Sequence, residues 1–223
     1  VVSDSGSIVS ADGIWTYTTE GTVDKVDPAE GQVGTRVTIT GSRLRGSASA
    51  VSKVTLAGEE AEIKSEADDE VVVAAASGSA GKGDVVLIAS TGATVTSANG
   101  FSYTTEGSVT ALSPDYGQVG TKVTVTGTGL RGAGKNVVSV TLGGVEVQSI
   151  TSENDTSVEV VAAASEEGEM SLGCAFVPAC KALKMLDVTV VADSGAIVTG
   201  TEKWALLAEG EIASVVPASG QVG

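Results

Sequence analysis

The stretch GQVGTRVTITG, residues 31–41, occurs a second time as GQVGTKVTVTG at residues 117–127. Its first four letters appear once more as GQVG at residues 220–223. In the first copy, apolar Val37 and Ile39 alternate with polar residues, which is the period of a strand with one buried face. A motif that returns in this way indicates a structural unit that is used several times in tandem.

The repeat extends beyond this motif. The sequence YTTEG at residues 17–21 returns as YTTEG at 103–107, and LLAEG takes the same place at 206–210. The repeat frame predicts four segments: residues 1–20 as the C-terminal strands of a preceding repeat, 21–106 as a complete repeat, 107–209 as a second complete repeat with an insert near 166–186, and 210–223 as the first strand of a following repeat. We expect the sequence to be part of a longer array.

The glycines of the motif have a predicted backbone role. Gly31 and Gly34 flank a tight turn in which a positive φ or a close backbone approach would exclude a side chain. Only four residues, TTEG or LAEG, connect the last strand of one repeat to the first strand of the next. So short a linker predicts a stiff rod, in which each domain adds roughly 35–45 Å of length.

The second repeat is longer than the first. We expect two of its 17 additional residues around residues 151–157 and fifteen after residues 160–165. The segment from Cys180 to Leu186 is the one candidate helix. Cys174 and Cys180 are the only cysteines, and we predict a disulfide between them in an oxidising compartment, with two free thiols as the alternative.

Short alternating runs separated by Gly, Asn, Asp and Ser predict an all-β fold of tandem immunoglobulin-like β-sandwiches joined end to end. The final strand of each unit has residues two apart that lie on one face. These residues are Trp15 with Tyr17, Phe101 with Tyr103, and Trp204 with Leu206. We expect them to pack in the core, and ligand stacking is the alternative.

A proline before GQVGT, an alternating VTITG, a later VTLAG and a closing aromatic-x-Tyr together resemble the IPT/TIG class of immunoglobulin-like domains, the class found in plexins and transcription factors. The resemblance implies an array of the kind that occurs in cell-surface and appendage proteins. It also implies two further settings, namely modules attached to starch-acting enzymes and to DNA-binding proteins.

Composition excludes several function classes. The net charge of −15 disfavours a phosphate backbone as a partner, so nucleic-acid binding is not expected. The chain has no histidine, which removes Ser-His-Asp and Cys-His catalysis. The acidic stretches at 66–70 and 165–169 are predicted to be solvated turns. We expect no enzyme activity, no catalytic residues, no cofactor and no metal site, and no membrane insertion in this segment.

The expected function is that of a structural subunit of an extracellular rod or fibril. Its partners would be further copies of itself or adjacent repeats of the same chain, with covalent glycans. Asn154, in the sequon NDT, is the glycosylation candidate. The alternatives are a cell-surface adhesin or receptor ectodomain that binds protein or carbohydrate through its loops and the insert, and an accessory domain of an enzyme.

Overall fold

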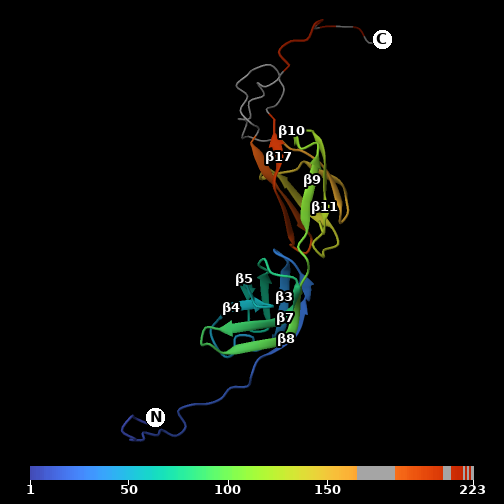
Figure 1. The fold of residues 1–223 in the computed structure, drawn as a ribbon. Coiled ribbons are helices and arrows are strands. Elements are labelled where there is room, and N and C mark those ends of the chain that lie inside the picture. The colour runs from blue at the N-terminus through green and yellow to red at the C-terminus, as the bar shows by residue number, and fades with distance from the viewer. Residues whose placement is uncertain (165–183, 208–211, 218, 220, 222–223) are drawn as a thin grey trace.

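The computed structural model describes residues 1–164, 184–207, 212–217, 219 and 221. Two β-domains follow one another along the long axis of the molecule, with the N-terminal segment at one end and the C-terminal segment at the other (Figure 1). Within the described residues the regular structure is all strand, and no helix occurs. The predicted all-β fold is therefore confirmed.

The first domain has eight strands that enclose one core. They are β1 (Thr22–Asp27), β2 (Glu30–Gly31), β3 (Arg36–Ser42), β4 (Val51–Leu56), β5 (Glu59–Glu66), β6 (Glu70–Ala74), β7 (Gly81–Ala89) and β8 (Thr94–Tyr103). Their order is β1-β3-β6-β5-β4-β7-β8-β2. Strand β5 pairs with β4 through its first residues and with β6 through its later ones, so it passes from one layer of the sandwich to the other.

The second domain repeats this arrangement in two separate sheets. Its strands are β9 (Ser108–Ser113), β10 (Tyr116–Gly117), β11 (Lys122–Thr128), β12 (Val137–Leu142), β13 (Val145–Glu146), β14 (Ser149–Glu153), β15 (Ser157–Val161), β16 (Met185–Ala192) and β17 (Ile197–Leu206). One sheet has the order β10-β17-β16-β12-β13 and the other β14-β15-β11-β9. Strands β13 and β14 thus take the place of the single β5.

Strand registers locate the additional residues of the second domain. Up to Val147 the two domains correspond at an offset of 86 residues, because Val140 bonds to Val147 where Val54 pairs with Ala61. From Ser149 the offset is 87, because Ser149 pairs with Val161 where Glu62 pairs with Ala74. Gln148 is therefore one extra residue, and it interrupts the strand. The other additional residues follow Ala162, so the expectation of two near 151–157 is wrong. The predicted helix is wrong at its end, because Lys184 is not helical and Met185 and Leu186 begin β16. Residues 180–183 of it lie outside the described residues.

Alternation along the strands fills each core with aliphatic side chains. Phe101, Tyr103 and Trp204 are 0%, 3% and 1% exposed, so they pack in the core as predicted. Trp15 and Tyr17 do not, because they are 76% and 89% exposed. In the described structure residues 1–20 form only a short bridge between Val2 and Ile8, which provides no sheet for these rings to pack against.

Candidate functional site: the joint between the two domains

The GQVG loop of the first domain has the conformation that its glycines require. Gly34 has φ +84°, a conformation that a residue with a side chain rarely adopts. A Cβ atom on Gly31 would lie 2.5 Å from the hydroxyl oxygen of Thr35. That hydroxyl accepts a hydrogen bond of 3.0 Å from the backbone amide of Gln32, which closes the loop. Both glycine roles predicted from the sequence are present.

Gln32, at the tip of this loop, connects the two domains. Its side-chain amide donates to the carbonyl oxygen of Ile197 in the second domain at 2.9 Å. Its side-chain oxygen accepts from the backbone amide of Gly107, in the linker, at 2.8 Å. The residue is 1% exposed, and a buried amide that lost these partners would cost about 1–3 kcal/mol. One side chain therefore binds the linker and the next domain at once.

Backbone hydrogen bonds complete the joint on either side of Gln32. The amide of Arg36 donates to the carbonyl of Ser194 at 2.8 Å, and the amide of Ile197 donates to the carbonyl of Val33 at 2.9 Å. These bonds do not depend on side-chain identity. They attach the loop before β3 in the first domain to the turn between β16 and β17 in the second domain.

Small residues let the two surfaces approach closely. A Cβ atom on Gly34 would lie 2.6 Å from the carbonyl oxygen of Gly195, and one on Gly132 would lie 3.0 Å from the side chain of Gln32. Any larger residue at these positions would push the domains apart. Close packing, three hydrogen bonds between the domains and one to the linker therefore restrain the angle between the domains, beyond what the short linker does.

The sequence predicts the short linker but does not single out Gln32 or the turn at residues 193–197. A signal was present, because glutamine occurs in all three copies of GQVG although neither strand nor turn requires it there. Nothing in the sequence paired it with the turn, since Gln32 and Ile197 are 165 residues apart.

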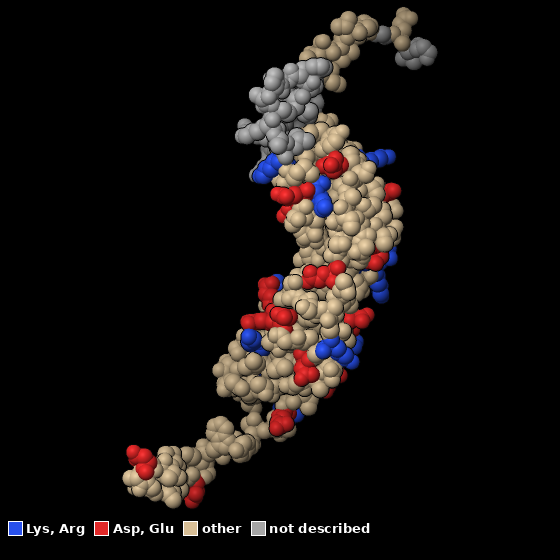
Figure 2. Space-filling view, in the orientation of Figure 1, with Lys and Arg blue, Asp and Glu red and all other residues tan. Residues whose placement is uncertain are grey.

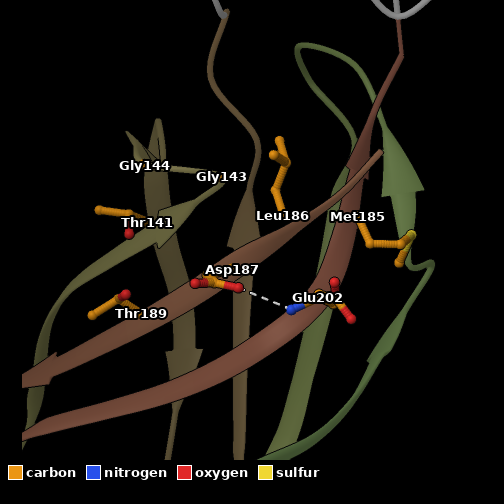
Figure 3. Close-up of a pocket in the computed structure, with 8 residues that line it drawn as sticks. All are labelled: Thr141, Gly143, Gly144, Met185, Leu186, Asp187, Thr189 and Glu202. Carbon is orange, nitrogen blue, oxygen red and sulfur yellow. Dashed lines mark hydrogen bonds between the residues drawn. The ribbon is translucent and has the colours of Figure 1, made fainter. Parts of the chain in front are cut away.

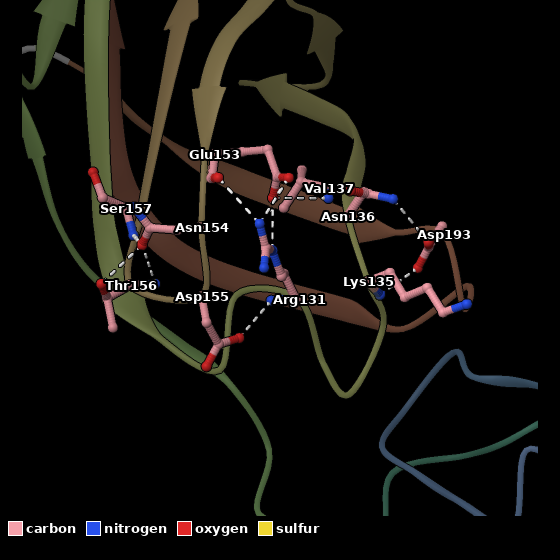
Figure 4. A network of polar contacts seen from close by, with 10 residues as sticks. All are labelled: Arg131, Lys135, Asn136, Val137, Glu153, Asn154, Asp155, Thr156, Ser157 and Asp193. Carbon is pink, nitrogen blue, oxygen red and sulfur yellow. Dashed lines mark hydrogen bonds and ion pairs between the residues drawn. The ribbon is translucent and has the colours of Figure 1, made fainter.

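A polar network lies near the joint in the second domain (Figure 4). Arg131 donates from Nε to Glu153 at 2.9 Å and from a terminal nitrogen to the second carboxylate oxygen at 2.9 Å. Glu153 also accepts from the amide of Val137 at 3.1 Å, and Asp155 accepts from the amide of Arg131. These contacts fix the loop before β12 against the end of β14.

The same network occurs in the first domain. Arg45 pairs with Glu66 at 2.8 Å, and Glu66 and Asp68 accept from the amides of Val51 and Arg45 respectively. The prediction of a purely solvated acidic turn is therefore wrong at Glu66, whose side chain is only 22% exposed. Recurrence in both domains indicates a structural function for these carboxylates.

Glu153 makes the second domain sensitive to acid. The hydrogen bond from Arg131 and that from the Val137 amide hold the pKa of Glu153 below its usual value, although partial burial opposes them. Because the pKa is lower in the folded chain than in the unfolded one, the ionised group stabilises the fold above its ordinary pKa of about 4.3. That stabilisation is lost as the pH falls through the lowered pKa.

We expect Glu153→Gln to lower the melting temperature of the second domain at pH 7 and to flatten its decline between pH 5 and pH 3. Thermal unfolding followed by circular dichroism across this pH range measures both effects. Glu159→Gln, at an exposed position on neighbouring β15, is the matched control and should leave the profile unchanged. A Glu153→Gln curve parallel to the wild-type curve would contradict the assignment.

Asn154 lies in the turn between β14 and β15 and is exposed. Its side-chain oxygen accepts three hydrogen bonds of 2.9 Å, from the amide and hydroxyl of Thr156 and from the amide of Ser157 (Figure 4). The sequon thus forms a surface turn whose asparagine is held in one orientation. The other predicted site residues, Cys174 and Cys180, lie outside the described residues.

A hollow of about 480 Å³ is lined by residues of β12, β16 and β17 and the turn at Gly143 and Gly144 (Figure 3). Its carboxylate Asp187 accepts a 2.9 Å hydrogen bond from the amide of Glu202. Asp84 accepts the corresponding bond from Asn99 in the first domain, at 2.7 Å. Asp187 therefore supports a strand irregularity that is present in both repeats, which is a structural role rather than a catalytic one.

Within the described part of the chain, no group of three or more Asp, Glu, Cys or His side chains is placed to hold a metal ion. No helix long and apolar enough to span a bilayer occurs among those residues.

Solved structures to which this chain is similar include the extracellular region of a plexin. The full extracellular region of Plexin A4 matches with a TM-score of 0.50 and 22% identity, covering 92% of this chain and 17% of that chain. A second structure of the Plexin A4 extracellular region matches with a TM-score of 0.45 and 23% identity, covering 88% and 19%. SGBP-B from a xyloglucan utilization locus of Bacteroides uniformis gives 0.33 and 18%, covering 84% and 50%. The chain thus spans under a fifth of the plexin chains.

Comparison with curated protein sequences gives no match. The family model described as the IPT/TIG domain matches twice, at residues 22–103 and 108–174. The first match begins with β1 and ends with β8, and the second begins with β9. The repeated motif, the paired sandwiches and both matches agree: this chain belongs to the IPT/TIG domain family, with two of its immunoglobulin-like domains in tandem.

Proposed function

We propose that the chain is a structural segment of an extracellular rod, in which IPT/TIG domains hold their neighbours at a fixed spacing and angle. The joint at Gln32 supports this most directly. A flexible tether would need only a linker, whereas this joint buries a polar side chain and adds backbone bonds between the domains. The chain then acts as a spacer or scaffold, and not as an enzyme.

The surface is consistent with a spacer. Acidic and basic side chains are interspersed on the face shown in Figure 2, and acidic groups are the more numerous in the sequence, 28 against 13. A net negative surface keeps an aliphatic protein in solution and disfavours association with nucleic acid. We propose further copies of the same kind of domain, with covalent glycans, as its partners.

Small-angle scattering of the 223-residue chain tests the rod. We expect an elongated particle whose scattering fits one fixed angle between the two domains. A profile that requires a broad range of interdomain angles would overturn the proposal. Gln32→Ala should broaden the distribution of interdomain angles that the scattering requires. Gln148→Ala, at an exposed glutamine away from the joint, should leave that distribution unchanged.

Glycosylation of Asn154 follows from an extracellular location. Expressed through a eukaryotic secretory pathway, the chain should gain the mass of one N-linked glycan, because the sequon forms an exposed turn. Asn154→Gln should abolish the gain and Thr156→Ser should retain it, as measured by mass spectrometry before and after enzymatic deglycosylation. An unmodified secreted chain would contradict this assignment.

Ligand recognition is the second candidate function, and the hollow beside Leu186 favours it. The insert near 166–186 ends within β16, which begins at Met185, so its last two residues, Met185 and Leu186, line the hollow. Deleting residues 166–183 should abolish partner binding while the domain stays folded. Unchanged binding of a candidate protein or glycan partner by the deletion variant would remove this function.

A further inference from the structure

The two domains expose opposite halves of the joint. In the first domain the loop of Val33 and Gly34 is partly covered, because the second domain lies against it. In the second domain the corresponding residues Val119 and Gly120 are exposed. A Cβ atom on Gly120 would meet nothing within 4 Å, whereas one on Gly34 would meet the carbonyl of Gly195. The two loops share a sequence but only the first is covered by a domain.

The turns show the reverse pattern. Ala196, in the turn that receives Gln32, is 0% exposed. Its counterpart Ala93 in the first domain is only half-buried, and Thr91 and Gly92 beside it are exposed. The hydrogen bonds within the two turns correspond, because Gly92 donates to Ala89 as Gly195 donates to Ala192, each at 2.9 Å. The turn is therefore already formed at the position where no domain covers it.

We propose that each of these exposed halves binds another IPT/TIG domain through the backbone contacts that Val33 and Arg36 make in the joint. The loop of Val119 and Gly120 docks on the 91–94 turn of a following domain, and the 91–94 turn of this chain receives the Gln-Val-Gly loop of a preceding one. The inference rests on the proposed function, which it deepens by naming the surface that each added domain uses.

Backbone chemistry makes the joint transferable between different turns. Ile197 contributes its carbonyl to Gln32 and its amide to Val33, and Ser194 contributes its carbonyl to Arg36. None of these groups belongs to a side chain of the turn. Thr94 takes the place of Ile197 in the first domain and offers the same two backbone groups, so the change of side chain does not remove the docking contacts.

Residues 1–9 show that the turn recurs. DSGSI at residues 4–8 differs from DSGAI at residues 193–197 at a single position. Gly6 donates to the carbonyl of Ser3 at 3.0 Å and has φ +79°, as Gly195 donates to Ala192 and has φ +85°. Because this turn forms without a domain against it, the docking surface is set by local sequence.

The inference is tested in a fused chain, residues 1–209 followed directly by residues 21–223. Gly21 then stands where Gly210 stands in the repeat, so the linker keeps the letters LLAEG and the added domain is the intact first domain. The readout is amide hydrogen exchange of the 91–96 segment, which is present twice. The first copy, whose turn faces no Gln-Val-Gly loop, is the internal reference.

We expect two equal populations for this segment, one of them exchanging about tenfold more slowly, since a hydrogen bond worth about 1.4 kcal/mol changes an opening equilibrium tenfold. Gly120→Ala should abolish the slow population, because a methyl group there would collide with the docked turn as one on Gly34 would with Gly195. The same substitution in the 223-residue chain should leave exchange of this segment unaltered.

A single fast population, with the core strands of the added domain fully protected, would overturn the inference. Retention of the slow population in the Gly120→Ala chain would overturn it as well, since protection would then have another origin. Amide exchange of residues 193–197, which contact the Gln32 loop, distinguishes failure of this inference from failure of the proposed function. If these residues stay protected, the joint between the two domains stands and only its use by further domains is wrong. If they exchange as fast as residues 91–96, the proposed rod is wrong.

Discussion

Replacing Trp204 with alanine is expected to destabilise the second domain by about 3–5 kcal/mol, the cost of truncating a large aromatic residue in a well-packed core. Trp204 is 1% exposed and packs in the aliphatic cluster formed by both sheets of this domain. Among the described residues of this domain the other aromatic side chain is Tyr116, which is 52% exposed and so contributes little to the core around Trp204. The first domain has a separate core around Phe101 and should keep its own transition.

Urea unfolding followed by circular dichroism measures this effect, with the first domain as an internal reference. Trp15→Ala is the matched control, because Trp15 is 76% exposed and its removal should change neither transition. Trp15 and Trp204 are the only tryptophans, so a Trp15→Phe chain also makes the fluorescence report on the second domain alone. Equal stabilities of the Trp204→Ala and Trp15→Ala chains would contradict the predicted packing.

Replacing Gly34 with alanine is expected to open the joint between the domains. Alanine at φ +84° costs about 1–2 kcal/mol, and its methyl group would lie 2.6 Å from the carbonyl oxygen of Gly195. Relief of this contact requires the second domain to move away, which breaks the bonds of Gln32. We therefore expect both a less stable chain and a broader distribution of interdomain angles.

Gly120→Ala isolates the contribution of the joint. Gly120 has φ +81°, so alanine there has the same backbone cost but meets no neighbouring atom. Residual dipolar couplings of the two domains measure their relative order, and denaturant unfolding measures stability. Gly34→Ala should lose interdomain order and exceed Gly120→Ala in its loss of stability. Identical behaviour of the two variants would show that no close contact exists at Gly34.

The sequence was sufficient for the architecture because the relevant signals are local and repeated. Alternation at Val37 and Ile39 sets which face of β3 is buried, and the turn at Gly34 needs a positive φ that few other residues allow. Both features occur again 86 residues later at Val123, Val125 and Gly120. Repetition at that distance identified a domain before any contact between strands was known.

The joint and the ion pairs could not be predicted in the same way, because they depend on residues that are distant in sequence. Glu66 is one acid among several in its turn, and only the fold brings it to Arg45. The sequence does not locate the added residue at Gln148, because hydrophobic alternation continues before and after a single inserted residue. The position of the insertion is therefore visible only in the strand pairing. Trp15 was assigned to a core by analogy with Phe101, although alternation alone does not supply the opposing sheet.

The joint also has a direction. It brings the GQVG end of one domain against the opposite end of the next, so the two surfaces in contact are different, and the association does not close on itself as a twofold interface does. Repeating one such step turns every added domain by the same amount relative to the last. An array built by repeating this step would follow a superhelical path with no fixed number of domains.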